Sequence, residues 1–129
     1  MMKTIHVVCA LIYDENHRIY ASQRGYGEMK DGWEFPGGKI EEQEKPEEAL
    51  IREIKEEMEV DIKINKYLCT IEHDYSTFHL SMDCFVCTLT SEGLHLNDHS
   101  AIKWINPFED KIDWVPADVK VIENYRKAN

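Results

Sequence analysis

The segment from Gly37 to Val60 constrains this chain most, because it joins a glycine pair to a helix that is unusually rich in acid. Pro46 suits the first position of a helix, and the two glutamates after it favour the positive end of the helix dipole. At about 100° per residue, one mostly apolar side of this helix is predicted to pack on a sheet, and it comprises Glu47, Leu50, Ile51, Ile54 and Met58. The pattern therefore predicts a glycine turn followed by a helix that begins at Pro46.

A second stripe of this helix is entirely acidic. Glu53, Glu56 and Glu57 lie together there, because residues three and four apart are neighbours on a helix surface. Two unit charges about 5 Å apart repel by roughly 3 kcal/mol at an effective dielectric of about 20. The ordinary explanation is an acidic face in open water. Here Lys55 and Arg52 are expected to project elsewhere and leave the stripe uncompensated, which instead indicates oxygen ligands for Mg²⁺ or Mn²⁺.

The charge of the chain is concentrated around the same helix. The net charge is −10, and residues 41–61 hold ten acids and three bases, a balance of −7. Nucleic acid polymers are bound through Lys and Arg, so this composition argues against such a partner. A small anionic substrate is compatible with the segment if divalent cations lie between the two. A length of 129 residues indicates one domain with a single core, spanning residues 1–129.

The remaining composition indicates a reduced cytoplasmic protein without a membrane segment. No apolar run reaches the roughly 18 residues that a membrane-spanning helix needs, and the first residues do not resemble a secretion signal. The four cysteines are therefore expected to stay reduced. Cys84 and Cys87 have redox or zinc spacing, but residues three apart on a strand point to opposite faces, which argues against a shared site.

Hydrophobic patterns place strands on both sides of the acidic helix. We predict strands over residues 5–13, 18–24, 33–35, 61–73, 77–90 and 100–105. Residues 14–17 and 74–76 are predicted hairpin connections, and residues 107–110 a turn or short helix. A final helix over 116–127 is expected to turn Val119, Ile122 and Tyr125 inward. This order predicts an α/β sandwich with a mixed sheet.

The spacing around the acidic helix also resembles a known motif. Gly38, five residues, Glu44, seven residues, Arg52-Glu53-Ile54, one residue, Glu56-Glu57, one residue and Glu59-Val60 resemble the Nudix box. That motif has about nine specified positions across 23 residues, and all but one agree here. The resemblance implies a Nudix-like α/β/α sandwich with a mixed β-sheet. The family usually has glycine where Glu59 stands. That glycine ends the helix in a left-handed turn, so Glu59 is expected to cost local stability.

The segment from Trp33 to Lys39 narrows the resemblance to the MutT type of nucleoside triphosphate pyrophosphohydrolase, similar to CTP pyrophosphohydrolases and 8-oxo-dGTP diphosphatases. This implies Mg²⁺-dependent hydrolysis of a (deoxy)nucleoside triphosphate, CTP-like or damaged, to the monophosphate and pyrophosphate. It also implies a small-molecule nucleotide as the partner of a monomer or homodimer. The alternatives are hydrolysis of a diphosphate-linked compound such as ADP-ribose, and a non-catalytic nucleotide-binding domain.

The resemblance implies roles for the residues of the box. The metal ligands are the carbonyl of Gly37 and the carboxylates of Glu53, Glu56 and Glu57. Glu53 is also the expected general base, with Asp98 as the competing choice, although a lone loop Asp is usually a turn former. Arg52 is expected to orient Glu53 and to pair with Glu44.

Outside the box, Arg24 and Lys39 correspond to residues that contact substrate phosphate, although Arg24 is equally compatible with an exposed strand-end arginine. Glu34 and Phe35 correspond to residues near the nucleobase, and core packing explains Phe35 as well.

Two further residues correspond to positions that contact the base. Asp118 matches a position that hydrogen-bonds the base edge, and it also suits the first turn of a helix as an acid. Phe78 stands where the oxidised-guanine enzyme has an arginine on the base side. This difference weighs against a preference for 8-oxoguanine.

Overall fold

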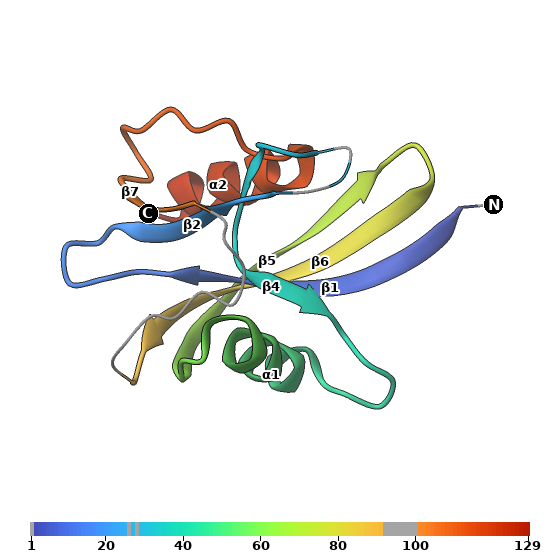
Figure 1. The fold of residues 1–129 in the computed structure, drawn as a ribbon, viewed down its shortest axis with the longest axis horizontal. Coiled ribbons are helices and arrows are strands. Elements are labelled where there is room, and N and C mark those ends of the chain that lie inside the picture. Colours follow the sequence, from blue (N-terminus) through green and yellow to red (C-terminus); the bar gives the residue numbers. More distant parts are fainter. Residues whose placement is uncertain (1, 26, 28, 92–100) are drawn as a thin grey trace.

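A mixed four-stranded sheet between two helices forms the centre of the molecule. The computed structural model describes residues 2–129 except 26, 28 and 92–100. The sheet order is β4-β1-β6-β5, with strands β1 (Lys3–Ile12), β4 (Gly37–Lys39), β5 (Ile62–Asp74) and β6 (Phe78–Leu89). Helix α1 (Pro46–Met58) covers one face and helix α2 (Pro116–Ala128) the other (Figure 1). β1 and β6 are parallel and the other pairs antiparallel, which confirms the predicted α/β sandwich with a mixed sheet.

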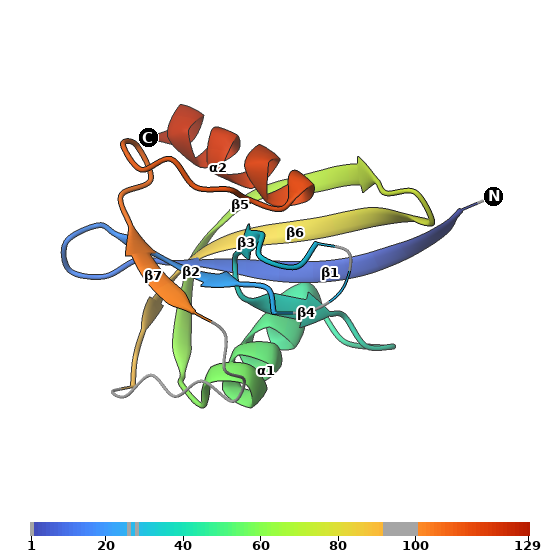
Figure 2. The same ribbon diagram turned by 45° about the horizontal axis from the view of Figure 1, so that its top comes forward.

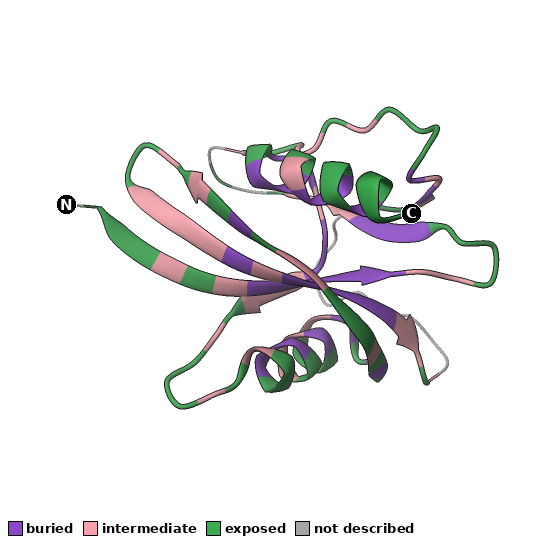
Figure 3. Cartoon of the chain, turned by 180° about the vertical axis from the view of Figure 1, so that it is seen from behind, coloured by how far each residue is buried: buried purple, intermediate pink, exposed green. Residues whose placement is uncertain are grey.

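The central strand β1 supplies side chains to both cores. Val8, Ala10 and Ile12 pack in the core under α1, whereas Cys9 and Leu11 pack in the core under α2. This follows from the alternation of side chains along a strand. Both helices bury the side that faces the sheet and expose the other (Figure 3). Cys84 and Cys87 divide between the two cores in the same way, so these thiols lie on opposite faces as predicted.

A second, three-stranded antiparallel sheet corrects one prediction. Its order is β3-β2-β7, with strands β2 (Ile19–Gln23), β3 (Trp33–Glu34) and β7 (Ile102–Ile105) (Figure 2). The turn predicted over residues 14–17 is present, with the Asp14 N–H bonded to the Arg18 carbonyl. The strand pairing of the predicted hairpin is wrong, because β1 and β2 are joined by a single bridge, between Tyr13 and Ile19. β2 instead pairs along its length with β7, about 80 residues later in the chain.

The glycine pair is a strand and not the predicted turn. Gly37 and Gly38 form β4 with Lys39 and pair with β1, and Gly37 lies opposite Cys9. A Cβ on Gly37 would overlap the carbonyl oxygen of Val8. Glycine is therefore used here for a close approach between two backbones.

Each helix packs through a face slightly different from the predicted one. In α1 the buried set is Ala49, Leu50, Ile54 and Met58, whereas Glu47 is exposed and Ile51 is 46% exposed. In α2, Ile122 and Tyr125 are buried as predicted, but Val121 is buried in place of Val119. None of the helices in the described part of the chain has the length and apolarity needed to cross a lipid bilayer.

Candidate active site

The site begins where β4 lies beside α1. The carboxylate of Glu53 rests against the backbone of Gly38, so closely that a Cβ on Gly38 would overlap Glu53 Cδ and Oε2. Glycine at residue 38 thus leaves the space that this carboxylate occupies. Pairing of β4 with β1 fixes the strand, and burial of Ile54 fixes the helix. The fold therefore holds the Glu53 carboxylate between two rigid elements.

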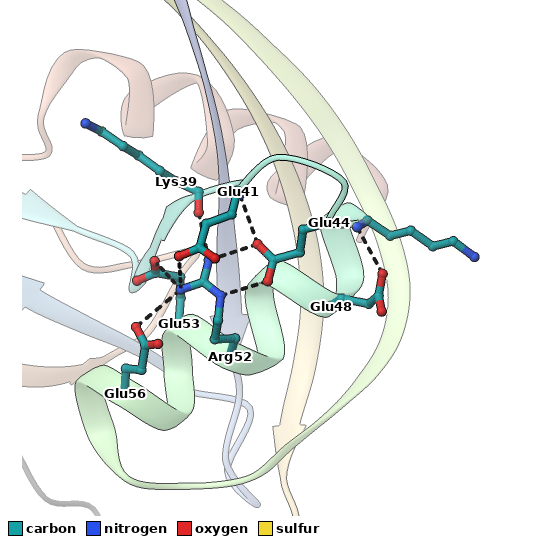
Figure 4. A network of polar contacts seen from close by, with 8 residues as sticks. Lys39, Glu41, Glu44, Glu48, Arg52, Glu53 and Glu56 are labelled. Carbon is teal, nitrogen blue, oxygen red and sulfur yellow. Dashed lines mark hydrogen bonds and ion pairs between the residues drawn. The ribbon is translucent and has the colours of Figure 1, made fainter.

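Arg52 gathers the acids of this region, which corrects the prediction of an uncompensated stripe. Its guanidinium binds both oxygens of Glu44, at 2.7 Å from Nε and 2.9 Å from Nη2. Nη1 lies 2.9 Å from Glu53 Oε1 and 3.2 Å from Glu56 Oε2, and Nη2 donates to the carbonyl of Lys39 at 3.0 Å (Figure 4). One arginine can do this because its planar fork presents several donors in fixed directions.

The ion pair also changes the acidity of its members. Hydrogen bonds from the Arg52 side chain and from the backbone N–H of Glu41 hold the pKa of Glu44 down at about 2. The hydrogen bonds to Glu44 and, less strongly, to Glu53 raise the pKa of Arg52, so the guanidinium keeps its charge at any pH the folded chain meets. The predicted pair between Arg52 and Glu44 is confirmed, and Glu53 is in direct contact with Arg52 as expected.

A cavity of about 540 Å³ connects this acidic corner to the opposite helix. Ten of the predicted site residues line it: Arg24, Glu34, Phe35, Gly37, Lys39, Glu53, Glu56, Glu57, Phe78 and Asp118. Arg52 and Glu44 do not line the cavity, but Arg52 contacts two of the lining residues, Glu53 and Glu56. Asp98 lies outside the described residues. The cavity floor is the face of β1 and β6 that carries Ile5, Val7, Leu80 and Met82.

The far end of the cavity holds a buried acid. Asp118 is only 5% exposed, and its Oδ2 accepts a hydrogen bond from the backbone N–H of Phe35 at 2.9 Å. Burial is the main cause that raises the pKa of Asp118 to about 7, and the N–H of Phe35 partly opposes it. This acid therefore holds its proton at a higher pH than an ordinary aspartate does.

Aromatic rings line the same end. Phe35 is 4% exposed and stacks on Trp114 at 4.5 Å, which agrees with the core-packing interpretation of this residue. Phe78 lies 5.1 Å from the ring of Tyr75. Sequence reasoning missed Tyr75 and Trp114 as neighbours of the site. Tyr75 lies in the predicted connection over residues 74–76, and Trp114 lies two residues before the predicted final helix.

Two charged residues that line the cavity, Arg24 and Glu34, form an ion pair that the sequence did not predict. Arg24 at the end of β2 binds both oxygens of Glu34 on β3, at 3.2 Å and 3.0 Å. Both side chains are about one quarter exposed (26% and 25%), so the pair is open to the cavity on one side. Any ligand there meets the two residues together.

The donor set of the acidic corner suits a divalent cation. Three carboxylates line one end of the cavity, and hard cations such as Mg²⁺ prefer oxygen ligands of this kind. Within the described residues, no three His, Cys, Asp or Glu side chains are placed close enough together to hold a metal ion. Arg52 occupies one oxygen each of Glu53 and Glu56, and the Glu56 side chain is largely exposed (62%).

Comparison with known proteins agrees with this architecture. The NUDIX domain family matches residues 2–125. The fold, an α/β sandwich with an acid-lined cavity beside a glycine strand, is that of a Nudix domain. The chain belongs to the Nudix hydrolase family.

Three relatives illustrate the similarity. The 8-oxo-dGTP diphosphatase of Proteus vulgaris is 37% identical over 87 residues, which cover 67% of this chain and 78% of that protein. The CTP pyrophosphohydrolase of Escherichia coli K12 is 27% identical over 126 residues, or 96% of this chain and 93% of that protein. The solution structure of the MutT protein from methicillin-resistant Staphylococcus aureus 252 has a TM-score of 0.77, 37% identity and 100% coverage of both chains.

Proposed function

We propose that this chain hydrolyses a (deoxy)nucleoside triphosphate to the nucleoside monophosphate and pyrophosphate. Water is added across the anhydride between the α- and β-phosphates, so one P–O bond breaks and one forms. One observation carries the proposal: a single cavity has carboxylates at one end and a buried acid among aromatic rings at the other. The first end suits a polyphosphate with its cations, and the second suits a nucleobase.

The base we propose is cytosine or a damaged base. Relatives of this chain are named for CTP and for 8-oxo-dGTP. Phe78 lines the cavity beside Tyr75 and gives the base end an apolar wall. Asp118 places an acid in the same cavity, and a carboxylate oxygen can accept from an exocyclic amino group of a base.

The proposed cofactor is Mg²⁺, with Mn²⁺ as a substitute. Its ligands would be the carbonyl of Gly37 and the carboxylates of Glu53, Glu56 and Glu57, all of which line the cavity. When bound, such ions supply positive charge that neutralises the triphosphate and lowers the pKa of a water. The acidic corner would otherwise repel the substrate.

The residues of the chain then position the reactants. Glu53 would take the proton from the attacking water, with Asp98 as the alternative base. Arg52 orients Glu53 through its contact at 2.9 Å and is itself fixed by Glu44. Lys39 and Arg24 would contact phosphate oxygens, because both line the cavity. Catalysis of this type depends mainly on position and charge.

A substrate panel tests the proposal. CTP, dCTP, dGTP, 8-oxo-dGTP and ADP-ribose are each incubated with the chain and Mg²⁺, and pyrophosphate and monophosphate are measured. We expect pyrophosphate release from at least one triphosphate. Cleavage of ADP-ribose alone would indicate a diphosphate-linked substrate, and tight binding without turnover would indicate a regulatory domain.

A pair of variants then tests whether Glu53 is the general base. Glu53→Gln is expected to lower kcat by about 10²–10⁴-fold, because a general base contributes on this order. Glu47→Gln is the matched control, since Glu47 lies on the same helix, exposed and outside the cavity. Near-normal turnover by Glu53→Gln would show that another residue is the general base.

A further inference from the structure

Tyr75 joins two walls of the cavity that are far apart in the sequence. It lies between β5 and β6, where its backbone N–H donates to the carbonyl of Phe78 at 2.9 Å. Its hydroxyl accepts a hydrogen bond from the backbone N–H of Ala117, in the first turn of α2, at 3.1 Å. Its ring lies 5.1 Å from that of Phe78, and both residues line the cavity. Tyr75 therefore connects the turn between β5 and β6 to the first turn of α2.

The contact with Ala117 alone has a simple structural explanation. Helix α2 begins at Pro116 without a side-chain cap from its own N-cap residue, Val115. The N–H groups of a first helical turn need partners from outside the helix, and the Tyr75 oxygen is such a partner. This explanation gives the Tyr75 hydroxyl a role as a hydrogen-bond acceptor, but it gives no partner to the proton of the hydroxyl.

The proton of the hydroxyl is free to reach a ligand. Among the described residues, the Tyr75 hydroxyl has only the hydrogen bond from Ala117, in which it is the acceptor. A phenol oxygen that accepts one hydrogen bond still has one to donate. Burial raises the pKa of Tyr75, so the hydroxyl stays protonated at neutral pH.

The next residue along α2 provides the complementary group. Asp118 follows Ala117 directly, and its Oδ2 is taken by the N–H of Phe35. Among the described residues, no hydrogen bond reaches its other oxygen, Oδ1, and Asp118 lines the cavity. A hydroxyl donor and a carboxyl oxygen thus line the same cavity, and Ala117, which is bonded to the Tyr75 hydroxyl, is the neighbour of Asp118 in the chain. Nucleobase edges present acceptors and donors side by side in the same manner.

We infer that Tyr75 is a substrate-binding residue, which donates a hydrogen bond from its hydroxyl to an acceptor atom on the edge of the base, beside the group bound by Asp118. The inference rests on the proposed function and adds to it a second polar contact at the base end. The contact involves the base only, and the triphosphate lies at the other end of the cavity.

This separation of the two ends allows a sharp test. Tyr75→Phe removes the hydroxyl and keeps the ring against Phe78. Tyr67→Phe is the matched control, because the Tyr67 hydroxyl is hydrogen-bonded to Thr70 on β5 (2.7 Å) and the residue is not part of the cavity wall. For both variants and the unchanged chain, kcat and KM are measured with the best nucleotide from CTP, dCTP, dGTP and 8-oxo-dGTP. The inhibition constant of inorganic tripolyphosphate, which has no base, is measured in parallel.

We expect Tyr75→Phe to raise KM for the nucleotide about three- to tenfold, the loss expected for one hydrogen bond between neutral groups. The value of kcat should stay within about twofold, and the inhibition constant of tripolyphosphate should not change. Tyr67→Phe should leave all three constants unchanged. Thermal unfolding of Tyr75→Phe is expected at a lower temperature, since Ala117 loses its acceptor, and this shift alone decides nothing.

Other outcomes overturn the inference. An unchanged KM with normal turnover would show that the hydroxyl only caps α2, and would leave the proposed function intact. A parallel weakening of tripolyphosphate inhibition, or a fall in kcat, would show a general disturbance of the cavity. Absence of turnover and of nucleotide binding in the unchanged chain would overturn the proposed function, and the inference with it.

Discussion

The carboxylate of Glu53 lies directly against Gly38, in space that any other residue at position 38 would fill with its Cβ. The atoms in the way are the far end of a flexible side chain, so a methyl group here would push the carboxylate aside without breaking the fold. The neighbouring Gly37 differs, because its Cβ would meet the backbone carbonyl of Val8. The two adjacent glycines thus have different roles. Gly38 leaves room for the Glu53 carboxylate, and Gly37 allows β4 to pair with β1.

We predict opposite phenotypes for these two positions. Gly38→Ala should fold with nearly unchanged stability and lose about a hundredfold in kcat, the order expected when a reacting group is displaced by about 1 Å. Gly37→Ala should lower the unfolding temperature strongly or fail to fold, since β4 cannot keep its register. Circular dichroism on heating and pyrophosphate release measure the two effects. A Gly38→Ala enzyme with normal turnover would contradict the importance of this contact.

Arg52 offers a second prediction, because one guanidinium donates hydrogen bonds to three carboxylates and a carbonyl. Lysine keeps the charge but cannot reproduce the fork, so Arg52→Lys should lower kcat by about 10–100-fold, the usual cost of losing a residue that orients a ligand. Lys55→Ala is the control, since Lys55 lies in the same helix and pairs with the exposed Asp61. Its surface pair should contribute little.

The pKa of Glu44 gives this prediction a spectroscopic check. The folded value of about 2 lies below the ordinary value, so the pair stabilises the fold above pH 4.5 and loses this effect as the pH falls toward 2. In Arg52→Lys, the NMR titration of Glu44 should move upward toward the ordinary range. An unshifted titration would show that Arg52 is not what holds this carboxylate.

Sequence patterns identified the acidic helix and the long strands because these features are local. The helix begins at Pro46 as predicted, and Glu59 adopts the left-handed conformation that its position in the motif demands. The connection at Asp74 to Ser76 also lies between two paired strands. Spacing along the chain is enough to reveal elements of this kind.

Sequence patterns failed where partners are distant. The second sheet depends on pairing between Ile19 and Ile105, which no local pattern encodes. A strand made of glycines was missed because glycine has low strand propensity, and only the contact with β1 explains it. The helical projection missed the contacts of Arg52 with the acidic stripe, because it places a side chain by its Cα and ignores the reach of a long one. The resemblance to the motif, in contrast, correctly implied that Arg52 meets Glu44 and Glu53.

Asp118 leads to a prediction about pH. Its pKa is about 7 in the fold and about 3.8 in the unfolded chain, so between these values the folded state holds a proton that the unfolded state has released. The free energy of unfolding contributed by this group therefore falls as the pH rises from about 4 to 7. Asp118→Asn should remove that decline, since asparagine still accepts from the N–H of Phe35, and should be the more stable protein at pH 8.

Urea unfolding at several pH values between 4.5 and 8.5 measures the effect of Asp118→Asn. Glu109→Gln serves as the control, because Glu109 is exposed and its substitution should leave the pH profile unchanged. A profile of Asp118→Asn that runs parallel to that of the original chain would mean that Asp118 is ionised in the fold at all these pH values.

The last prediction concerns Glu59, which ends α1 at φ 56° and ψ 35° with its N–H bonded to the carbonyl of Lys55 at 3.0 Å. A side chain in this left-handed conformation costs roughly 1–2 kcal/mol, and glycine avoids most of it while losing some entropy on folding. Glu59→Gly should therefore raise the free energy of unfolding by about 0.5–1 kcal/mol, seen as a rise of a few degrees (~2–5 °C) in Tm. Glu59→Ala removes the same negative charge without relieving the backbone, and should bring no such gain. Equal stabilisation by both variants would trace the effect to charge repulsion with the acids of α1, and not to the backbone.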